Sequence, residues 1–445
     1  SLVANTTGAQ SVAVGSEALE ANTTGNYNVA VGKGSLHANT TGSLLVAVGI
    51  NCLASNTTAL YNVGVGHSAL NANTTGAKNV AVGSQALLTN TTASHNTAVG
   101  YTALNSNTTG GQNTAVGLGS LFNNTTGTYN LGIGYVALGQ NTTGAWNTAV
   151  GGDALYANTT GDYNVAIGGN SLTVNTTGDT NTAVGYEALG KNTTASNNTA
   201  VGFQALEDNT TGNQNTAVGH TALHTNTTGS HGVAIGYQAL YDNTTGAYCT
   251  AVGYQCLENN TTATGSVGLG FRAGQLVTTG SYNTVIGYGA GDVITTGSGN
   301  TCIGDDAGGN ITTGSNNLVL GRNASTAAVN SLNTVTLGSS DIGTLRCQVQ
   351  TISALSDERD KTDIIDLKDG LDVIDSLRPR KFTWSMREPS ANDGKTETGF
   401  IAQELDAALG TKNDYIHIVD KTNPDKLEAA YGRLIPILVN AVKEL

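Results

Sequence analysis

A strict 17-residue period runs through the first three quarters of the chain. The triplet Asn-Thr-Thr begins at Asn5 and Asn22 and occurs sixteen times, without slippage, up to Asn260. A glycine keeps the same period from Gly15 to Gly338. Degenerate copies of the triplet continue the register at Val277, Ile294 and Ile311. A fixed period of this kind is typical of repeat proteins, in which each unit packs only against its neighbours.

Each unit carries an apolar-small-apolar segment before its glycine, and we expect this segment to be a β-strand. In Val12-Ala13-Val14, the outer residues and the middle residue point to opposite faces if the segment is extended. Branched residues favour that conformation. A second apolar pair, Ala18-Leu19, follows, and we expect it to form a second short strand. A helix is disfavoured, because no window offers three helical turns without a glycine, which costs about 1 kcal/mol inside a helix.

Units built from two short strands and Gly/Asn turns predict the coils of a parallel β-solenoid, or β-roll. Stacked coils place equivalent residues about 4.8 Å apart, so about twenty coils would give a rod on the order of 95 Å long. We expect the Val14 and Leu19 ladders to form the core, and the Gly15 column to need a positive φ or a close backbone approach. The Ala13 column is also apolar but should face the other way. Both faces of the strand should then be covered, the second by the neighbouring chains of a homotrimer.

Composition divides the chain near residue 350. Residues 1–355 hold 6 Lys+Arg and 14 Asp+Glu, whereas residues 356–445 hold 13 and 18. We therefore predict a repeat shaft at 1–340, a connector at 341–355 and a second domain at 356–445. The net charge of −13 argues against a nucleic-acid partner. Membrane insertion is not expected, because no apolar run approaches the ~20 residues of a membrane span.

The repeat core, N-x-V/T-A-V/I-G, resembles the heads of trimeric autotransporter adhesins. Similar repeats occur in phage tail fibres. The twenty recurrences of the glycine column make the resemblance specific to this style of solenoid. It does not distinguish the two biological settings.

Four motifs follow one another in the second part of the chain. They are S-D-x-R-x-K at 356–361, F-T-W at 382–384, G-F-I-A-Q-E-L at 399–405 and Y-x-x-L-x-x-x-L-x-x-A-V-K-E-L at 431–445. This order closely resembles the endosialidase-type intramolecular chaperone domain. The resemblance implies a small α+β domain that trimerises, directs the folding of the fibre ahead of it and then cuts itself off.

The same resemblance assigns the residues of the cut. It places the cleaved bond between Leu355 and Ser356, with Ser356 as the nucleophile and Lys361 as the general base. Asp357 and Arg359 also match the motif and are given supporting roles. A serine hydroxyl needs an adjacent base, and lysine can serve where burial disfavours its charged form. The alternative is that Ser356 caps the following segment and Lys361 is a solvated charge.

The end of the chain is predicted to form a coiled-coil-like helix. Apolar residues recur there at alternating spacings of four and three, which is typical of a seam that packs against a core or a partner helix. These residues are Leu427, Tyr431, Leu434, Leu438, Ala441 and Leu445.

Other signals are interpreted as structural. The Asn-Thr-Thr triplets are formal glycosylation acceptors, but we expect Asn and Thr to satisfy backbone groups at the coil turns. Cys52, Cys256 and Cys302 occupy slots of buried small residues, so no disulfide framework is predicted. His220 and His224 are four apart but straddle a turn, so we expect no metal site. No cofactor motif is present.

These features favour a homotrimeric phage tail fibre with a self-releasing chaperone. It would attach to a host cell-surface receptor, for which a carbohydrate is the candidate. It would fold in the host cytoplasm and become extracellular in the virion. Catalysis would be limited to a single-turnover autoproteolysis. The alternatives are a bacterial trimeric surface adhesin, which would carry a membrane anchor, and an ice-binding solenoid, suggested by the stacked Thr6-Thr7 columns.

Overall fold

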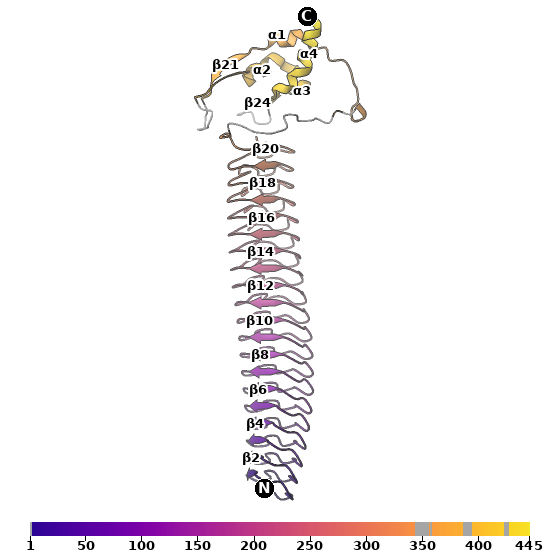
Figure 1. The fold of residues 1–445 in the computed structure, drawn as a ribbon, viewed down its shortest axis with the longest axis vertical. Helices are drawn as coiled ribbons and strands as arrows, with labels where there is room; N and C mark the ends of the chain where they lie inside the picture. The colour runs from indigo at the N-terminus through magenta and orange to yellow at the C-terminus, as the bar shows by residue number, and fades with distance from the viewer. Residues whose placement is uncertain (1, 343–355, 357, 386–393, 422–426) are drawn as a thin grey trace.

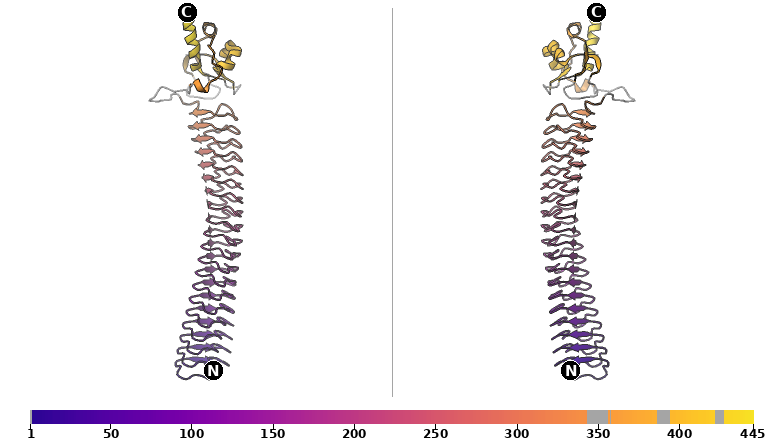
Figure 2. Two further views of the ribbon diagram at one scale, coloured as in Figure 1. Left: turned by 90° about the vertical axis from the view of Figure 1, so that its right-hand side faces the viewer. Right: turned by 90° about the vertical axis from the view of Figure 1, so that its left-hand side faces the viewer.

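The computed structural model describes residues 2–342, 356, 358–385, 394–421 and 427–445 (Figure 1). Residues 2–342 wind into a long, gently curved rod of stacked coils (Figure 2). The described residues after 355 form a separate set of short helices and strands. The chain is therefore mainly β, with its helices confined to the C-terminal part that the structure describes.

Each coil of the rod contributes one three-residue strand. Strands pair in parallel with the equivalent residues of the next coil, as Val12↔Val29 and Ala13↔Ala30 show. The twenty strands form one continuous sheet. Their bounds are β1 (Val12–Val14), β2 (Val29–Val31), β3 (Val46–Val48), β4 (Val63–Val65), β5 (Val80–Val82), β6 (Thr97–Val99), β7 (Thr114–Val116), β8 (Leu131–Ile133), β9 (Thr148–Val150), β10 (Val165–Ile167), β11 (Thr182–Val184), β12 (Thr199–Val201), β13 (Thr216–Val218), β14 (Val233–Ile235), β15 (Thr250–Val252), β16 (Val267–Leu269), β17 (Thr284–Ile286), β18 (Thr301–Ile303), β19 (Leu318–Leu320) and β20 (Val335–Leu337).

The prediction of a second strand in each coil is wrong. The Ala18-Leu19 pair lies in a turn, because Leu19 adopts a left-handed backbone with φ 51°. Fourteen equivalent leucines, from Leu36 to Leu257, do the same. A left-handed residue cannot continue an extended strand, so the chain bends inward and carries the leucine side chain into the coil.

The assignment of faces also needs correction. The Ala13-type column faces the interior, where Ala98, Ala149 and their equivalents are fully buried together with the leucines. The Val14-type column faces outward instead: Val99 is 37 % exposed and Ile167 is 41 % exposed. Alternation along a strand separates the two faces, but the closing turn decides which face is inside. The small residue lies inside because the leucine from the turn fills the space opposite it.

Two polar columns of the Asn-Thr-Thr triplets bond to neighbouring coils, the asparagine column buried and the first threonine column half-buried. The Asn158 amide donates to Asn141 Oδ1 of the preceding coil at 2.8 Å and to the Gly161 carbonyl at 3.0 Å. Such asparagines form a ladder that is fully buried through most of the rod. The neighbouring Thr159 hydroxyl donates to the Thr176 carbonyl at 3.0 Å. The triplets thus satisfy backbone groups as expected, and a buried amide with both of these partners is closed to glycosylation in the folded rod.

The glycine column has both properties expected of it. Gly151 adopts φ +138°, and a Cβ atom there would lie 2.6 Å from the Gly168 carbonyl oxygen of the next coil. A side chain would therefore meet backbone, which cannot move aside as a flexible side chain can. The adjacent Gly152 has open space around it. The steric constraint therefore applies to the Gly15-type column and not to every glycine of the shaft.

The C-terminal part is a small α+β unit around its own core. Its helices and strands are η1 (Glu358–Asp360), α1 (Leu371–Ser376), β21 (Arg380–Thr383), β22 (Thr396–Gly399), α2 (Ala402–Leu409), η2 (Gly410–Lys412), α3 (Asn413–Ile416), β23 (Val419–Asp420), β24 (Glu428–Ala429), η3 (Tyr431–Leu434) and α4 (Ile435–Glu444). Strands β21–β22 and β23–β24 form two antiparallel pairs. The core is formed by Val373, Leu405, Leu409, Ile418 and Ile437.

The final helix is shorter than the predicted seam. Helix α4 begins at Ile435 because Pro436, which has no backbone N–H to donate, is favoured in the first turn of a helix. Leu434 and Ala441 of the seam are buried, whereas Leu438 and Leu445 are exposed. Leu427 and Tyr431 lie before the helix. No helix in the described ranges is long and apolar enough to span a membrane.

Candidate functional site

Ser356 and Lys361, the proposed nucleophile and base, lie in contact. The Lys361 ammonium donates to Ser356 Oγ at 2.6 Å. The short helix η1 between them turns the chain back, and the Lys361 N–H donates to the Glu358 carbonyl at 3.1 Å. A five-residue separation that would span a long distance in a strand is therefore closed by a single turn.

The rest of the assigned site is described only in part. Arg359 lies in η1 next to the pair. Leu355 and Asp357 lie outside the described residues. Ser356 and Lys361 are both exposed in the single chain. The observed contact brings the amine and the hydroxyl together at a site that is open in the single chain.

A charged network stabilises the segment that follows the pair. Lys412 Nζ lies 2.8 Å from Asp369 and 2.9 Å from Asp372, and the Tyr415 hydroxyl donates to Asp369 at 2.6 Å. The hydrogen bond from Lys412 lowers the pKa of both carboxyl groups, and Tyr415 adds to the effect at Asp369. The two carboxylates in turn raise the pKa of Lys412. The network joins the start of α1 to α3 across about forty residues of sequence.

A paired arginine connects strand β21 to helix α2. Arg380 donates from Nε to Glu404 at 2.8 Å and from Nη2 to the other carboxylate oxygen at 2.6 Å. This two-pronged geometry is the strongest form of an arginine–carboxylate contact. The guanidinium lowers the pKa of Glu404. Glu404 belongs to the G-F-I-A-Q-E-L motif, so one motif residue has a structural partner that sequence reasoning did not identify.

The last helix is tied back to the segment that follows the Ser356–Lys361 pair. The Leu371 N–H donates to the Glu444 carboxylate at 2.6 Å, and the Asn440 amide donates to the Leu367 carbonyl at 2.6 Å. Each bond spans 73 residues. The terminal K-E-L motif therefore has a structural role in holding the segment after the candidate dyad.

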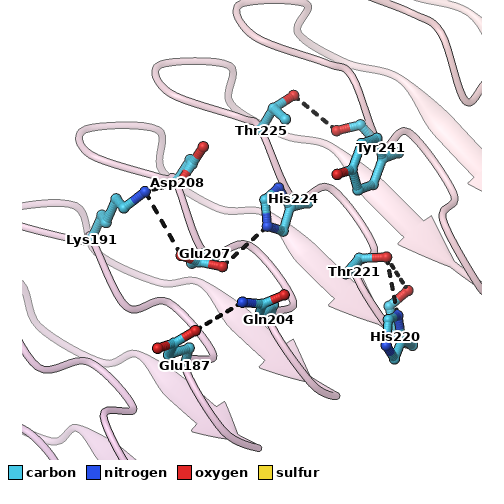
Figure 3. Close-up of polar contacts among 10 residues, drawn as sticks. All are labelled: Glu187, Lys191, Gln204, Glu207, Asp208, His220, Thr221, His224, Thr225 and Tyr241. Carbon is cyan, nitrogen blue, oxygen red and sulfur yellow. Dashed lines mark hydrogen bonds and ion pairs between the residues drawn. The ribbon is translucent and has the colours of Figure 1, made fainter.

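The shaft carries a charged surface over several neighbouring coils (Figure 3). The Lys191 ammonium contacts Asp208 at 2.5 Å and Glu207 at 3.7 Å. His224 Nε2 lies 3.0 Å from Glu207, and its ring stacks on Tyr241 at 5.1 Å. Among the described residues, no group of three or more His, Cys, Asp or Glu side chains could hold a metal ion. The contacts with Glu207 and Tyr241 place His224 in a ladder of side chains from neighbouring coils.

His220 belongs to a different ladder. Seven aromatic rings at equivalent positions stack along the rod, with centroids 4.9–5.7 Å apart. They are Tyr186, Phe203, His220, Tyr237, Tyr254, Phe271 and Tyr288. Because each ring covers the face of the next, the rings present mainly their edges to the surroundings.

The four cysteines that the structure describes are free and buried. Burial raises the pKa of the Cys52, Cys256 and Cys302 thiols to about 12. A protonated thiol in an apolar interior is unreactive. These residues fill core positions, as the repeat register predicts.

Two features define the class of this protein. The first is a β-solenoid rod of stacked 17-residue coils. The second is a small α+β domain that follows the rod and in which Ser356 and Lys361 are in contact. Residues 356–412 match the family model described as chaperone of endosialidase. No curated protein and no solved structure matches the chain. The chain thus combines a β-solenoid with an endosialidase-type chaperone domain, as the sequence resemblance indicated, and it is tail-fibre-like in this combination.

Proposed function

We propose that the chain forms the shaft of a homotrimeric phage tail fibre, and that its C-terminal domain directs trimer folding and then releases itself by cutting between Leu355 and Ser356. The observation that carries the proposal is the 2.6 Å contact between Ser356 and Lys361 at the start of the segment that matches the chaperone family. The sequence motif assigns the same two residues as nucleophile and base.

The cut is an acyl transfer to the serine that follows the broken bond. Ser356 Oγ attacks the carbonyl carbon of Leu355, and Lys361 takes the hydroxyl proton. The C–N bond then breaks, the proton passes to the released α-amino group of Ser356, and Leu355 is left as an ester on Oγ. Water hydrolyses the ester, which gives a free carboxylate on Leu355 and restores the serine hydroxyl.

The exposure of the pair implies that assembly controls the reaction. Lysine becomes a useful base where burial removes water from its charged form. Both side chains are exposed in the single chain, so a neighbouring chain would have to cover them. Cleavage would then follow trimer formation, and the chaperone would stay attached until the trimer has folded.

Two apolar surfaces support the trimer. The Val14-type column leaves a half-exposed aliphatic stripe along the whole sheet, with Ile133 as one member. Helix α4 exposes Ile435, Val439 and Val442, the last at 71 %. Contiguous apolar surface of this kind is uncommon on a monomer and marks interaction sites. Three chains around one axis would cover both surfaces.

Attachment to a host receptor completes the proposal. The released shaft would present its ladders of hydroxyl, amide and aromatic groups to a cell-surface carbohydrate. Binding of the purified shaft to host cells, and its loss after enzymatic removal of surface glycans, would test this part. Binding that survives glycan removal would point to a protein receptor instead.

The ice-binding alternative is weakened by one observation. The hydroxyl of the Thr6 column donates to the backbone carbonyl of the next coil, as Thr6 Oγ1 does to Thr23 at 2.9 Å. Only the Thr7 column remains as an exposed hydroxyl array. An ice-binding surface would need its hydroxyls free.

The cleavage is tested by expressing four versions of the full chain and analysing them on denaturing gels and by mass spectrometry. The wild type should yield a fragment that begins at Ser356. Ser356→Ala removes the nucleophile, and Lys361→Arg substitutes a side chain that stays protonated. Both should leave the chain intact. Lys368→Arg is the matched control, because Lys368 is also exposed in the same segment, and it should cut normally.

Other outcomes would overturn parts of the proposal. A wild-type chain that stays intact as a well-folded trimer contradicts the cut. A fragment that persists in Lys361→Arg removes lysine as the base. A monomeric wild type contradicts the trimer whatever happens to the bond.

A further inference from the structure

Every coil of the shaft holds residues in the left-handed region. Most repeats have three, as in the ninth, where Trp146, Asp153 and Leu155 adopt φ of 60°, 55° and 53°. This conformation costs roughly 1–2 kcal/mol for residues other than glycine. Strain is therefore built into each coil, and stacking against the next coil must offset it.

The last coils of the regular shaft are built differently. We number each repeat by its strand, so that repeats 16, 17 and 18 cover residues 260–276, 277–293 and 294–310. Six of their nine left-handed positions are glycine, which adopts this region without strain. They are Gly265, Gly274, Gly289, Gly291, Gly299 and Gly308. In the fifteen preceding repeats, only Gly34 and Gly119 are glycines with φ near 60°, the Gly15-type column with its larger φ being a separate position.

The core of these coils is rearranged to match. Where earlier repeats have a left-handed leucine, repeats 16–18 have glycine. The lost apolar volume returns three residues later as Val277, Ile294 and Ile311, which are the first residues of repeats 17, 18 and 19. All three are fully buried and replace the buried asparagine of the ladder, which repeat 16 still has as Asn260. A Cβ on Gly291 would lie 2.8 Å from Ile294 Cδ1, so the two positions share one space. The aliphatic group thus moves from a strained backbone to one whose φ is negative.

This difference matters most when the first coils form. The strands bond only to neighbouring coils, as the pairing of β16 with β15 and β17 shows. A single coil has its strain but no stacking partner, so the first pair of coils meets the full cost before any gain, as in the nucleation of a helix. Glycine at the left-handed positions and aliphatic groups in place of buried amides lower that cost.

We propose that repeats 16–18 are the folding nucleus of the shaft, from which the coils add one by one toward the N-terminus. The nucleus lies in the C-terminal third of the shaft and is separated in sequence from the chaperone domain by strands β19 and β20 and by residues 343–355. A template at that end of the shaft would act close to the coils that form most easily. The inference goes beyond the proposed function and does not require cleavage.

The test follows folding repeat by repeat. The full chain carrying Ser356→Ala, which keeps the chaperone attached, is diluted from denaturant and pulse-labelled by hydrogen–deuterium exchange. Mass spectrometry then reports when each repeat becomes protected. Repeats 16–18 should be protected first and repeats 2–8 last. Simultaneous protection, or protection that begins near the N-terminus, would overturn the proposal.

A matched pair of variants sharpens the result. Gly289 and Gly34 occupy the same position of their repeats, with φ 59° and 66°, and in each the atom nearest an added Cβ would be a side-chain oxygen of the next coil. Gly289→Gln adds about 1 kcal/mol of strain to the nucleus and should slow protection of all repeats about fivefold. Gly34→Gln should leave repeats 16–18 at the unsubstituted rate. Equal slowing of repeats 16–18 by both variants would contradict the proposal.

The two tests separate this inference from the proposed function. If Gly289→Gln fails to fold, the order of protection in the unsubstituted sequence still decides. If the cut between Leu355 and Ser356 is absent from the wild type, the order of protection is unaffected, because the labelled chain is already uncut.

Discussion

The shaft and the C-terminal domain bury their apolar residues to very different extents. In the shaft, the alanine and leucine columns are closed within one chain, and Leu155 and Ala149 are both fully buried. The C-terminal domain has a small core and leaves Val442 71 % exposed and Leu445 89 % exposed. The interior of the shaft is thus complete in a single chain, whereas the domain that would guide its folding is not.

The two regions also differ in the range of their contacts. Polar bonds in the shaft mostly join residues 17 apart, as from Asn158 to Asn141. Those in the domain join residues as far apart as Leu371 and Glu444. A local network can grow coil by coil, but a network of distant pairs must form together. The difference predicts that substitutions act through a column in the shaft and through the whole unit in the domain.

The largest effect is expected at the glycine column. Gly151→Ala would place a Cβ 2.6 Å from the Gly168 carbonyl at φ +138°. Backbone strain and overpacking each cost roughly 1–3 kcal/mol, so we expect a loss of about 4 kcal/mol in unfolding free energy. Denaturant melts followed by circular dichroism measure it. Gly152→Ala is the control and should change little, because nothing surrounds that position; equal losses would refute the column argument.

The asparagine ladder should give the next largest effect. Asn158→Ala leaves Asn141 Oδ1 without its donor and removes one of the two acceptors of the Asn175 amide, whereas the Gly161 carbonyl keeps its bond from the Asn147 amide. A buried group left unpaired costs roughly 1–3 kcal/mol, so we expect a loss of about 2 kcal/mol in unfolding free energy. Thr160→Ala, at an exposed position of the same triplet, should stay within about 0.5 kcal/mol. A small loss at Asn158 would mean that water replaces the amide.

The exposed apolar face of α4 is expected to contact the other chains of the trimer. Val442→Asp introduces a charge on a surface that we propose is covered by the other chains, and should weaken the trimer at least tenfold, which corresponds to about 1.4 kcal/mol. Light scattering over a concentration series measures the association. Lys443→Asp, on an adjacent exposed residue, is the control. If Val442→Asp has no effect, the trimer contact lies elsewhere.

Acid should act on the two regions with opposite signs. Lys412 lowers the pKa of Asp369 in the domain, so that carboxylate contributes stability above its unfolded pKa of about 3.9, and the contribution is lost as the pH falls toward the lowered value. In the shaft, burial raises the pKa of Asp242 and Asp292. Protonation is then easier in the folded state, so stability there rises slightly as the pH falls through the raised values.

The two tryptophans allow this comparison to be measured in one chain. Trp146 reports on the shaft and Trp384 on the domain, so Trp146→Phe and Trp384→Phe each leave a single tryptophan whose fluorescence can be followed. Below about pH 4 the domain signal should lose stability first. Asp369→Asn should remove part of that acid sensitivity. Parallel loss in both regions would contradict the assignment.

The sequence period was sufficient to predict the parallel register and the reason for the glycine column. It could not predict that Leu19 is left-handed, because an apolar residue after a glycine turn is compatible with either a strand or an inward bend. The predicted orientation of Ala13 was wrong for the same reason, because it assumed that a second strand closes each coil. Periodicity identifies the columns, whereas the turn decides which of them are inside.

The candidate site was predictable to a different degree. The closeness of Ser356 and Lys361 followed from a motif within one turn of chain. The Asp369–Lys412–Tyr415 network and the pairing of Arg380 with Glu404 did not, because their members are 24 to 46 residues apart and no spacing pattern relates them. The cleaved bond itself stays a prediction.

The alignment of the inter-coil bonds determines how the shaft would respond to tension. If its two ends are pulled apart, the coils peel away one at a time, because each is held mainly by the next. Every detached coil releases 17 residues, which extend to about 56–61 Å, while the remaining rod shortens by about 4.8 Å. The fibre would therefore yield in steps of about 5 nm and absorb work at each step instead of breaking at one point.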